Sequence, residues 1–215
     1  MYLPAHFKEE RLPVLHELIR VHPLATLVTL GADGLTANHI PLLIDPERGA
    51  NGTLVGHVAR ANPVWRDHRP EVDTLAVFAG PQSYVSPSYY PSKRETGMVV
   101  PTWNYAVVHA WGPLRIVDDV DWLRALVTSL TETHEGGKHL PWKVTDAPDA
   151  FIEKQLQAIV GIELPIRRID GKWNVSQNRP AADREGVVAG LHGAGDDQAM
   201  QMADLVAKAH RAKGR

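Results

Sequence analysis

Residues 24–44 read LATLVTLGADGLTANHIPLLI, and this stretch decides the fold class. Two runs of apolar and β-branched residues flank Gly31-Ala32-Asp33-Gly34, which is a turn signal. The pattern predicts an antiparallel hairpin with strands at residues 24–30 and 35–44. Pro41 predicts an edge strand or a bulge within the second run, because proline has no N–H to donate to a neighbouring strand.

Further strands follow at short intervals, and helices are inserted between some of them. Strands are expected at residues 53–58, 74–79, 83–86, 104–117, 162–169 and 172–176, with a turn at Asp170-Gly171. Helices are expected at about residues 9–21, 63–68, 119–130, 148–160, 179–191 and 196–213. This order lacks the regular βαβ alternation. It predicts an α+β protein, with a six- to seven-stranded, mostly antiparallel β-barrel and peripheral helices.

Composition narrows the function classes. The chain has 215 residues and a formal net charge of −2, and its body carries no basic stripe of the kind that nucleic-acid-binding proteins show. The absence of cysteine excludes disulfides and thiolate metal sites. The N-terminal residues lack a leader pattern and no apolar run approaches membrane-spanning length, so the cytoplasm is the expected location and no membrane partner is expected.

The C-terminal end is locally basic. We interpret it as a solvated helix end whose cations suit the negative pole of the helix dipole. The residues concerned are Lys208, His210, Arg211, Lys213 and Arg215.

Residues 56–63, GHVARANP, join the end of a strand to the start of a helix. Unpaired N–H groups at a helix start suit phosphate, and Arg60 adds a guanidinium that can bind an anion with two hydrogen bonds. Asn62 lies beside it. The alternative is a surface arginine next to an ordinary helix cap.

Two other stretches place polar groups where a flat ligand could lie. In residues 37–41, ANHIP, Asn38 and His39 interrupt a strand that otherwise reads as core, although they also fit an outward-facing polar pair. Residues 84–93, YVSPSYYPSK, concentrate hydroxyls, aromatic rings and Lys93 in a loop whose shape prolines fix. That loop predicts a binding segment, with a packed surface loop as the alternative.

Two later stretches complete the candidate set. In residues 101–105, PTWNY, Trp103 can cover an apolar ring and Asn104 can meet a polar ring edge, unless Trp103 is core. Residues 172–179, KWNVSQNR, crowd amides, a hydroxyl and two cations together, which favours an anionic or electron-rich ligand. The alternative there is that Asn178 caps the next helix.

Metal and catalytic motifs are missing from the sequence. His134 and His139 flank Glu135, but Gly136-Gly137 breaks the helical ligand spacing, and there is no HExxH motif. We therefore predict no metal site and identify no catalytic residue. Dinucleotide-binding, phosphate-loop and nucleophile-elbow motifs are absent too.

Taken in order, five blocks make the chain resemble the PaiB family of FMN-binding negative transcriptional regulators, within the FMN-binding split-barrel superfamily. The resemblance implies a split barrel, a homodimer and FMN bound in a groove between subunits. It runs from the N-terminus to about residue 191, so we expect a domain at residues 1–192 and a helical extension at residues 193–215. The blocks are residues 37–41, residues 56–63, residues 80–81 with 84–93, residues 100–105, and residues 176–180 with 183–184.

The resemblance also gives the candidate residues roles toward FMN. Arg60 and Asn62 would bind the phosphate, with Lys93 as a second-tier cation. The flavin ring would lie against Asn38, His39 and Ile40, and Trp103 and Asn104 would contact the ring or the ribityl chain. The remaining candidates would reach the flavin of the partner subunit: Lys172, Ser176, Gln177 and Asn178.

Three functions stay open at this point. The first is an FMN-binding regulator, although the chain shows no helix-turn-helix and its residues do not support direct DNA binding. The second is a flavin-dependent oxidoreductase or flavin reductase that uses a reduced nicotinamide, in which the flavin would do the redox chemistry. The third is a haem-handling protein with His57 or His109 as the axial ligand.

Overall fold

A computed structural model describes residues 1–212, with side chains described through residue 209. The chain divides into two compact units. Unit 1 comprises Met1–Leu18, Ala79–Val108 and Asp170–Arg215, and unit 2 comprises Ile19–Phe78 and His109–Ile169. Among the described residues no helix has both the length and the apolar character that crossing a membrane requires.

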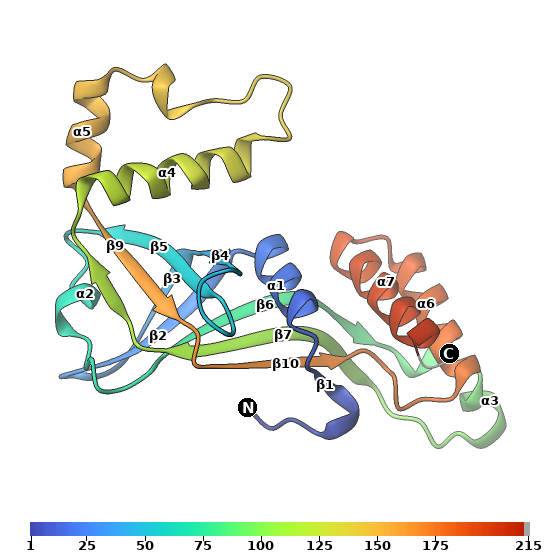
Figure 1. The fold of residues 1–215 in the computed structure, drawn as a ribbon. Coiled ribbons are helices and arrows are strands. Elements are labelled where there is room, and N and C mark those ends of the chain that lie inside the picture. Colours follow the sequence, from blue (N-terminus) through green and yellow to red (C-terminus); the bar gives the residue numbers. More distant parts are fainter. Residues whose placement is uncertain (213–215) are drawn as a thin grey trace. The chain divides into compact units, whose positions relative to one another are not determined.

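The strands form two sheets (Figure 1). The six-stranded sheet has the order β1-β10-β7-β6-β2-β3, and the four-stranded sheet has the order β4-β5-β9-β8. Antiparallel pairing joins β2 to β3 and β6, β5 to β4 and β9, β8 to β9, and β1 to β10. The α+β, mostly antiparallel class is therefore confirmed. The bounds are β1 Lys8–Glu9, β2 Leu24–Gly31, β3 Gly34–Pro41, β4 Leu43–Asp45, β5 Thr53–Ala59, β6 Thr74–Val85, β7 Thr102–Gly112, β8 Arg115–Val117, β9 Ile159–Pro165 and β10 Arg168–Asn174.

The hairpin predicted from residues 24–44 forms as β2 and β3. Its register pairs Gly31 with Gly34 at the turn and Leu24 with Pro41 at the open end. Gly34 has φ +108°, a conformation that side chains disfavour. The second predicted strand, residues 35–44, is divided after Pro41. Leu42 is buried between the two parts, and the chain continues as β4 in the four-stranded sheet.

Two strands, β6 and β10, continue through glycines at which the sequence predicts a break or a turn. Residues 74–85 form one strand, β6, and a Cβ at Gly80 would lie 2.8 Å from Leu18 Cδ1 and 3.1 Å from the Ala106 carbonyl oxygen. Asp170-Gly171 is not a turn but part of β10, where a Cβ on Gly171 would overlap Leu15. Both glycines allow close packing inside continuous strands.

The predicted strand at residues 104–117 is also two strands. It forms β7 and β8, and Pro113 stands in the interval between them. Proline has no N–H for a sheet ladder, so the break falls where a backbone donor is missing.

The helices match the predicted segments with shifted ends. Asp119 caps α4, its Oδ1 accepting from the Trp122 N–H at 2.8 Å. In unit 2, α4 lies over β5 and β9 (Figure 1), and Leu123 packs with Ile152 and Leu156 of α5. The loop predicted at residues 84–93 contains η2 and the start of α3. The bounds are η1 Ala5–Phe7, α1 Leu12–Val21, α2 Val64–Asp67, η2 Pro87–Tyr89, α3 Ser92–Thr96, α4 Val120–Glu135, η3 Val144–Asp146, α5 Asp149–Gln157, α6 Ala181–Ala194 and α7 Asp197–Ala212.

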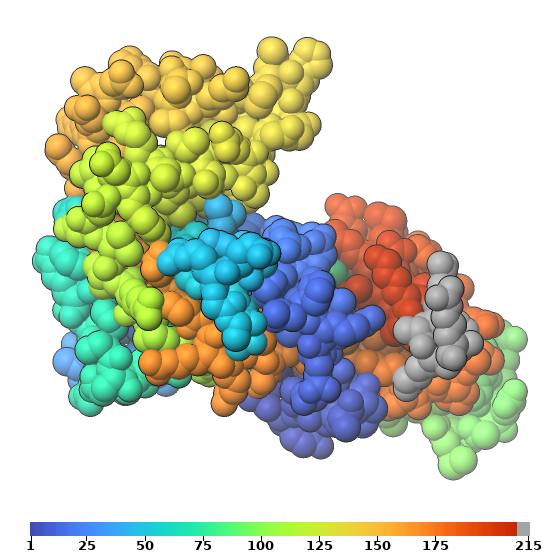
Figure 2. Space-filling view, viewed as in Figure 1, coloured from blue at the N-terminus to red at the C-terminus, as the bar shows by residue number. Residues whose placement is uncertain are grey.

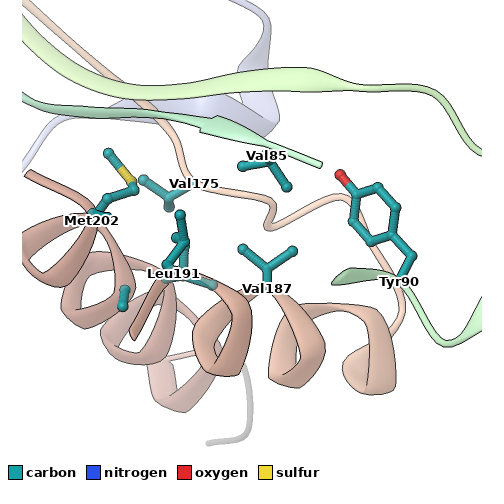
Figure 3. Packing of buried hydrophobic residues seen from close by; sticks show 9 residues of the cluster. Val85, Tyr90, Val175, Val187, Leu191 and Met202 are labelled. Carbon is teal, nitrogen blue, oxygen red and sulfur yellow. The ribbon is translucent and has the colours of Figure 1, made fainter. Parts of the chain in front are cut away.

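The last two helices of unit 1 share one apolar core (Figure 3). Val187 and Leu191 of α6 pack with Met202 of α7 and with Val85 and Val175, and all of these side chains are fully buried. The helix expected at residues 196–213 is α7. The domain boundary after residue 192 stays a prediction.

The basic C-terminal end is described only in part. Lys208 is exposed, as expected for a solvated helix end. The side chains of His210, Arg211, Lys213 and Arg215 lie outside the described residues.

We expect Leu191→Ala to lower the free energy of unfolding by about 2–5 kcal/mol, because it leaves a cavity in the core between α6 and α7. Urea denaturation measures the change. Leu140→Ala is the matched control, since Leu140 is 83% exposed. Its effect should stay within about 0.5 kcal/mol. Equal losses in the two variants would contradict this packing.

Candidate functional site

In unit 2, two asparagines link β3 to the segment after β5. Asn62 Nδ2 donates to Asn38 Oδ1 at 2.8 Å, and Asn62 Oδ1 accepts from the Val64 N–H at 3.0 Å. The Asn38 Nδ2 is buried and has no partner among the described residues. A buried donor without an acceptor costs about 1–3 kcal/mol. The arrangement therefore favours an acceptor that the chain itself does not supply.

The three residues of β3 that were predicted to contact the flavin ring, Asn38, His39 and Ile40, do not all point to the same face of the strand. Ile40 is buried and Asn38 is half-buried, whereas His39 is exposed between them. Its Nδ1 lies 3.2 Å from Thr26 Oγ1 on the neighbouring strand. Successive side chains of a strand point to opposite faces, so Asn38 and Ile40 share a face that His39 does not.

Arg60 is fully engaged inside unit 2. Its guanidinium donates to both carboxylate oxygens of Asp118, Nη1 to Oδ2 at 2.9 Å and Nη2 to Oδ1 at 2.6 Å. It also donates to the carbonyl oxygens of Gln157 at 2.8 Å and Ile159 at 3.0 Å. The hydrogen bonds between the two side chains raise the pKa of Arg60 and lower that of Asp118. A phosphate at Arg60 would therefore have to displace a carboxylate.

In unit 1, Asn104 and Ser176 form a buried polar pair. Asn104 Nδ2 donates to Ser176 Oγ at 2.9 Å, and Asn104 Oδ1 has no partner among the described residues. Ser176 has φ +61°, and among the described non-glycine residues it is the one with a positive φ. Strained backbone of this kind is enriched at functional sites. Two predicted site residues thus lie together.

Trp103 is not core, which removes the alternative interpretation of that residue. Its side chain is 51% exposed, its ring lies 6.2 Å from the Tyr84 ring, and its Nε1 donates to Gln82 Oε1 at 3.1 Å. The Trp103 carbonyl accepts from Asn174 Nδ2 at 3.0 Å. These contacts fix the indole at the surface of unit 1, where its face can cover an apolar ring.

The other candidates of unit 1 are held differently. Lys172 Nζ donates to the Tyr2 carbonyl at 3.2 Å and lies 5.3 Å from the Tyr105 ring. Gln177 folds back, with Nε2 donating to the Trp173 carbonyl and Oε1 accepting from the Val175 N–H. Asn178 and Lys93 are exposed. The N-cap of α6 is Pro180, so Asn178 does not take the predicted capping role.

Asp183 lies in the last of the five blocks but was assigned no role from the sequence, and the structure shows that it holds a neighbouring segment in place. Its carboxylate is almost fully buried and accepts from Ser92 N–H at 3.1 Å and from Ser92 Oγ at 2.7 Å. A Cβ at Gly186 or Gly190 would overlap Tyr89. These contacts hold the segment of η2 and α3 against α6. In the sequence, this contact could have been found from Gly186 and Gly190, because glycines four residues apart in a helix share one face and allow another segment to approach it closely.

The candidate residues therefore form two groups. Asn38, His39, Ile40, Arg60 and Asn62 lie in unit 2, and Lys93, Trp103, Asn104, Lys172, Ser176, Gln177 and Asn178 lie in unit 1. Direct hydrogen bonds join Asn38 to Asn62 and Asn104 to Ser176.

Comparisons with known proteins identify a family model and relatives that match most of the chain. A family model described as "Putative FMN-binding domain" matches residues 1–168. The chain is 31% identical to the protease synthase and sporulation protein PAI 2 of Bacillus subtilis, with 96% of each chain covered. It is 34% identical to an uncharacterized protein of Emericella nidulans, again over 96% of each chain.

Solved structures share the fold at low identity. A protein of Mycobacterium smegmatis described as binding FAD and haem matches with a TM-score of 0.57 and 17% identity, over 85% of this chain and 80% of the other. The flavocytochrome Anf3 of Azotobacter vinelandii matches with a TM-score of 0.56 and 11% identity, over 78% and 69%. These similarities place the chain in the flavin-binding split-barrel fold.

We expect Asp118→Asn to tighten FMN binding about tenfold, because it removes the carboxylate that competes for the Arg60 guanidinium. Quenching of flavin fluorescence measures the affinity. Riboflavin, which lacks the phosphate, is the matched ligand and should bind the variant and the parent protein equally. Asp121→Asn, in the first turn of α4, is the control. Equal changes for the two ligands, or no change, would leave Arg60 with a structural role alone.

Proposed function

Because the chain belongs to the FMN-binding domain family whose model covers residues 1–168, we propose that it is a homodimeric FMN-binding regulator of the PaiB type. The observation that carries this proposal is the similarity to PAI 2, which extends over nearly the full length of both chains. FMN is the cofactor of the family, and when bound it supplies redox chemistry that side chains lack.

The residues present fit an FMN molecule in three respects. The buried Asn38 Nδ2 lacks an acceptor, which the carbonyl edge of a flavin ring offers. The half-exposed Trp103 indole offers a flat apolar wall. Lys93 offers an exposed cation, and Arg60 offers another once Asp118 releases it. The proposal that the groups of each unit contact FMN rests on the family and on this chemistry.

The proposed dimer is supported by an exposed apolar surface on unit 1. We call it the Trp103 patch, and it consists of Tyr84, Met98, Val100 and Trp103, which are 49%, 83%, 64% and 51% exposed. Aromatic residues and methionine are enriched in protein interfaces. A second copy of the chain would cover these side chains and would bring its own flavin contacts to the same place.

We infer that any regulatory output is indirect. The formal net charge of −2 offers little attraction to a phosphate backbone. In α7, Met202 and Val206 are fully buried in the core shared with α6, so these side chains are not available to contact DNA. A flavin whose redox state changes the contacts of the dimer would instead act through another protein.

A second candidate is a flavin-dependent oxidoreductase that uses a reduced nicotinamide, because a bound flavin itself supplies the redox chemistry. The two candidates differ in what the purified protein does. We expect one FMN per chain to be released on denaturation, with no steady-state turnover when NADH or NADPH is added. Turnover would favour the oxidoreductase. Promoter binding that weakens with salt would show direct DNA contact, and a Soret band would favour a haem protein.

We expect Trp103→Asp to convert the dimer to a monomer, because it buries a charge in the proposed interface. Analytical ultracentrifugation measures the mass. Trp142→Asp is the matched control, since Trp142 is also surface-exposed, at 45%, but lies in unit 2 outside the patch. A parent protein that sediments as a monomer, or a Trp103→Asp variant that stays dimeric, would remove this interface.

A further inference from the structure

Unit 1 holds a cavity of about 400 Å³ between its N-terminal segment, the end of β10 and α7. We call it the Trp173 cavity. Apolar side chains of Trp173, Val175 and Leu205 line it, together with the cationic side chains of Lys8, Arg11 and Lys208. The N-terminal segment and α7 are the dark blue and red parts of unit 1 in Figure 2. Its volume lies within the range of roughly 300–1,000 Å³ typical of small-molecule sites.

The apolar wall of the cavity is held in place by packing. Val175 is fully buried in the core of α6 and α7, and Trp173 and Leu205 pack against that core. A Cβ on Gly171 would lie 3.0 Å from Trp173 Cζ3, so the glycine leaves room for the indole. The Gln177 side chain ties the Trp173 carbonyl to the Val175 N–H. The indole therefore needs little reordering to receive a flat ligand.

The charged groups at the cavity differ in how they are satisfied. Arg11 is bound to Glu9, with Nε 2.9 Å from Oε1 and Nη2 2.6 Å from Oε2. Burial would raise the pKa of Glu9, but hydrogen bonds from Arg11 outweigh it and hold that pKa below its usual value. Lys8 pairs with Glu10. Lys208 is exposed and has no ion-pair partner among the residues that the structure describes.

A second cavity of similar size shows that volume alone does not select a ligand. It holds about 410 Å³ in unit 2, between α4 and the segment before η3. Its charges balance, since Arg124 and Lys143 stand against Glu132 and Glu135. At the Trp173 cavity three lining cations, Lys8, Arg11 and Lys208, stand against two carboxylates: Glu9 in the lining and Glu10, which pairs with Lys8. Of these two cavities, both lined by described residues, the Trp173 cavity is the one that combines an aromatic side chain with an excess of positive charge.

We propose that the Trp173 cavity binds a small aromatic monocarboxylate. The flat ring lies against the Trp173 indole and Leu205, and the carboxylate pairs with the Lys208 ammonium. Glu9 and Glu10 already pair with Arg11 and Lys8, so among the described lining residues Lys208 is the cation left to pair with a ligand carboxylate. This site is separate from the proposed flavin contacts, apart from Gln177, whose polar atoms are already bonded to the backbone.

The test is isothermal titration of the FMN-loaded protein with 1-naphthoate, with neutral 1-naphthamide as the matched ligand. We expect naphthoate to bind about tenfold more tightly than naphthamide. Lys208→Gln should abolish that preference, and Trp173→Leu should weaken both ligands. Trp142→Leu and Lys143→Gln, which alter the second cavity, should leave both affinities unchanged. Lys208 is exposed, so its variant should unfold like the parent.

Three results would overturn the proposal. Equal affinity of the parent protein for both ligands would show that no anion site exists. Loss of naphthoate binding in Trp142→Leu would assign the ligand to the second cavity. Displacement of naphthoate by added FMN in the flavin-free protein would make the cavity part of the flavin site. Failure of FMN binding itself, with naphthoate binding intact, would count against the proposed function only.

Discussion

The packing of α1 against strand backbone is the contact on which unit 1 depends. Leu15 and Leu18 are buried because Gly171 and Gly80 present bare backbone beneath them. Any side chain at either glycine would push the helix away from its strand. The same close approach at Gly171 leaves room for the Trp173 indole. The absence of a side chain at Gly171 therefore affects both the position of α1 and the shape of the Trp173 cavity.

Polar side chains of this protein fall into two classes that look alike in sequence. In the first class, Arg60, Asn62 and Gln177 form hydrogen bonds within their own unit. Arg60 and Asn62 bond to residues far away in the chain, and Gln177 bonds to the backbone four residues before it. Asn38 and Asn104 each have one buried side-chain atom without a partner among the described residues. Because buried polar atoms are almost always bonded, the second class marks where an added group has the most to satisfy.

The sequence predicted the hairpin, most helices and the fold class, since these depend on local periodicity and on turn residues. It did not predict that residues 74–85 form one strand or that Asp170-Gly171 lies inside another, because a glycine that permits packing looks like a glycine that permits a turn. The ordered blocks located the candidate residues. The pairing of Arg60 with Asp118 was out of reach, because 58 positions separate them and neither residue type specifies its partner.

The chain passes from one sheet to the other within a single residue, Leu42, which follows β3 and precedes β4. Leu42 is buried, and a Cβ on Gly56 of β5 would overlap its side chain. No slack exists at this crossing to absorb a shift in pairing. Inserting one residue into β3 would turn the side chains that follow it to the opposite face of the strand, because successive side chains alternate, so the turn at Gly31–Gly34 accommodates a change in hairpin length more readily.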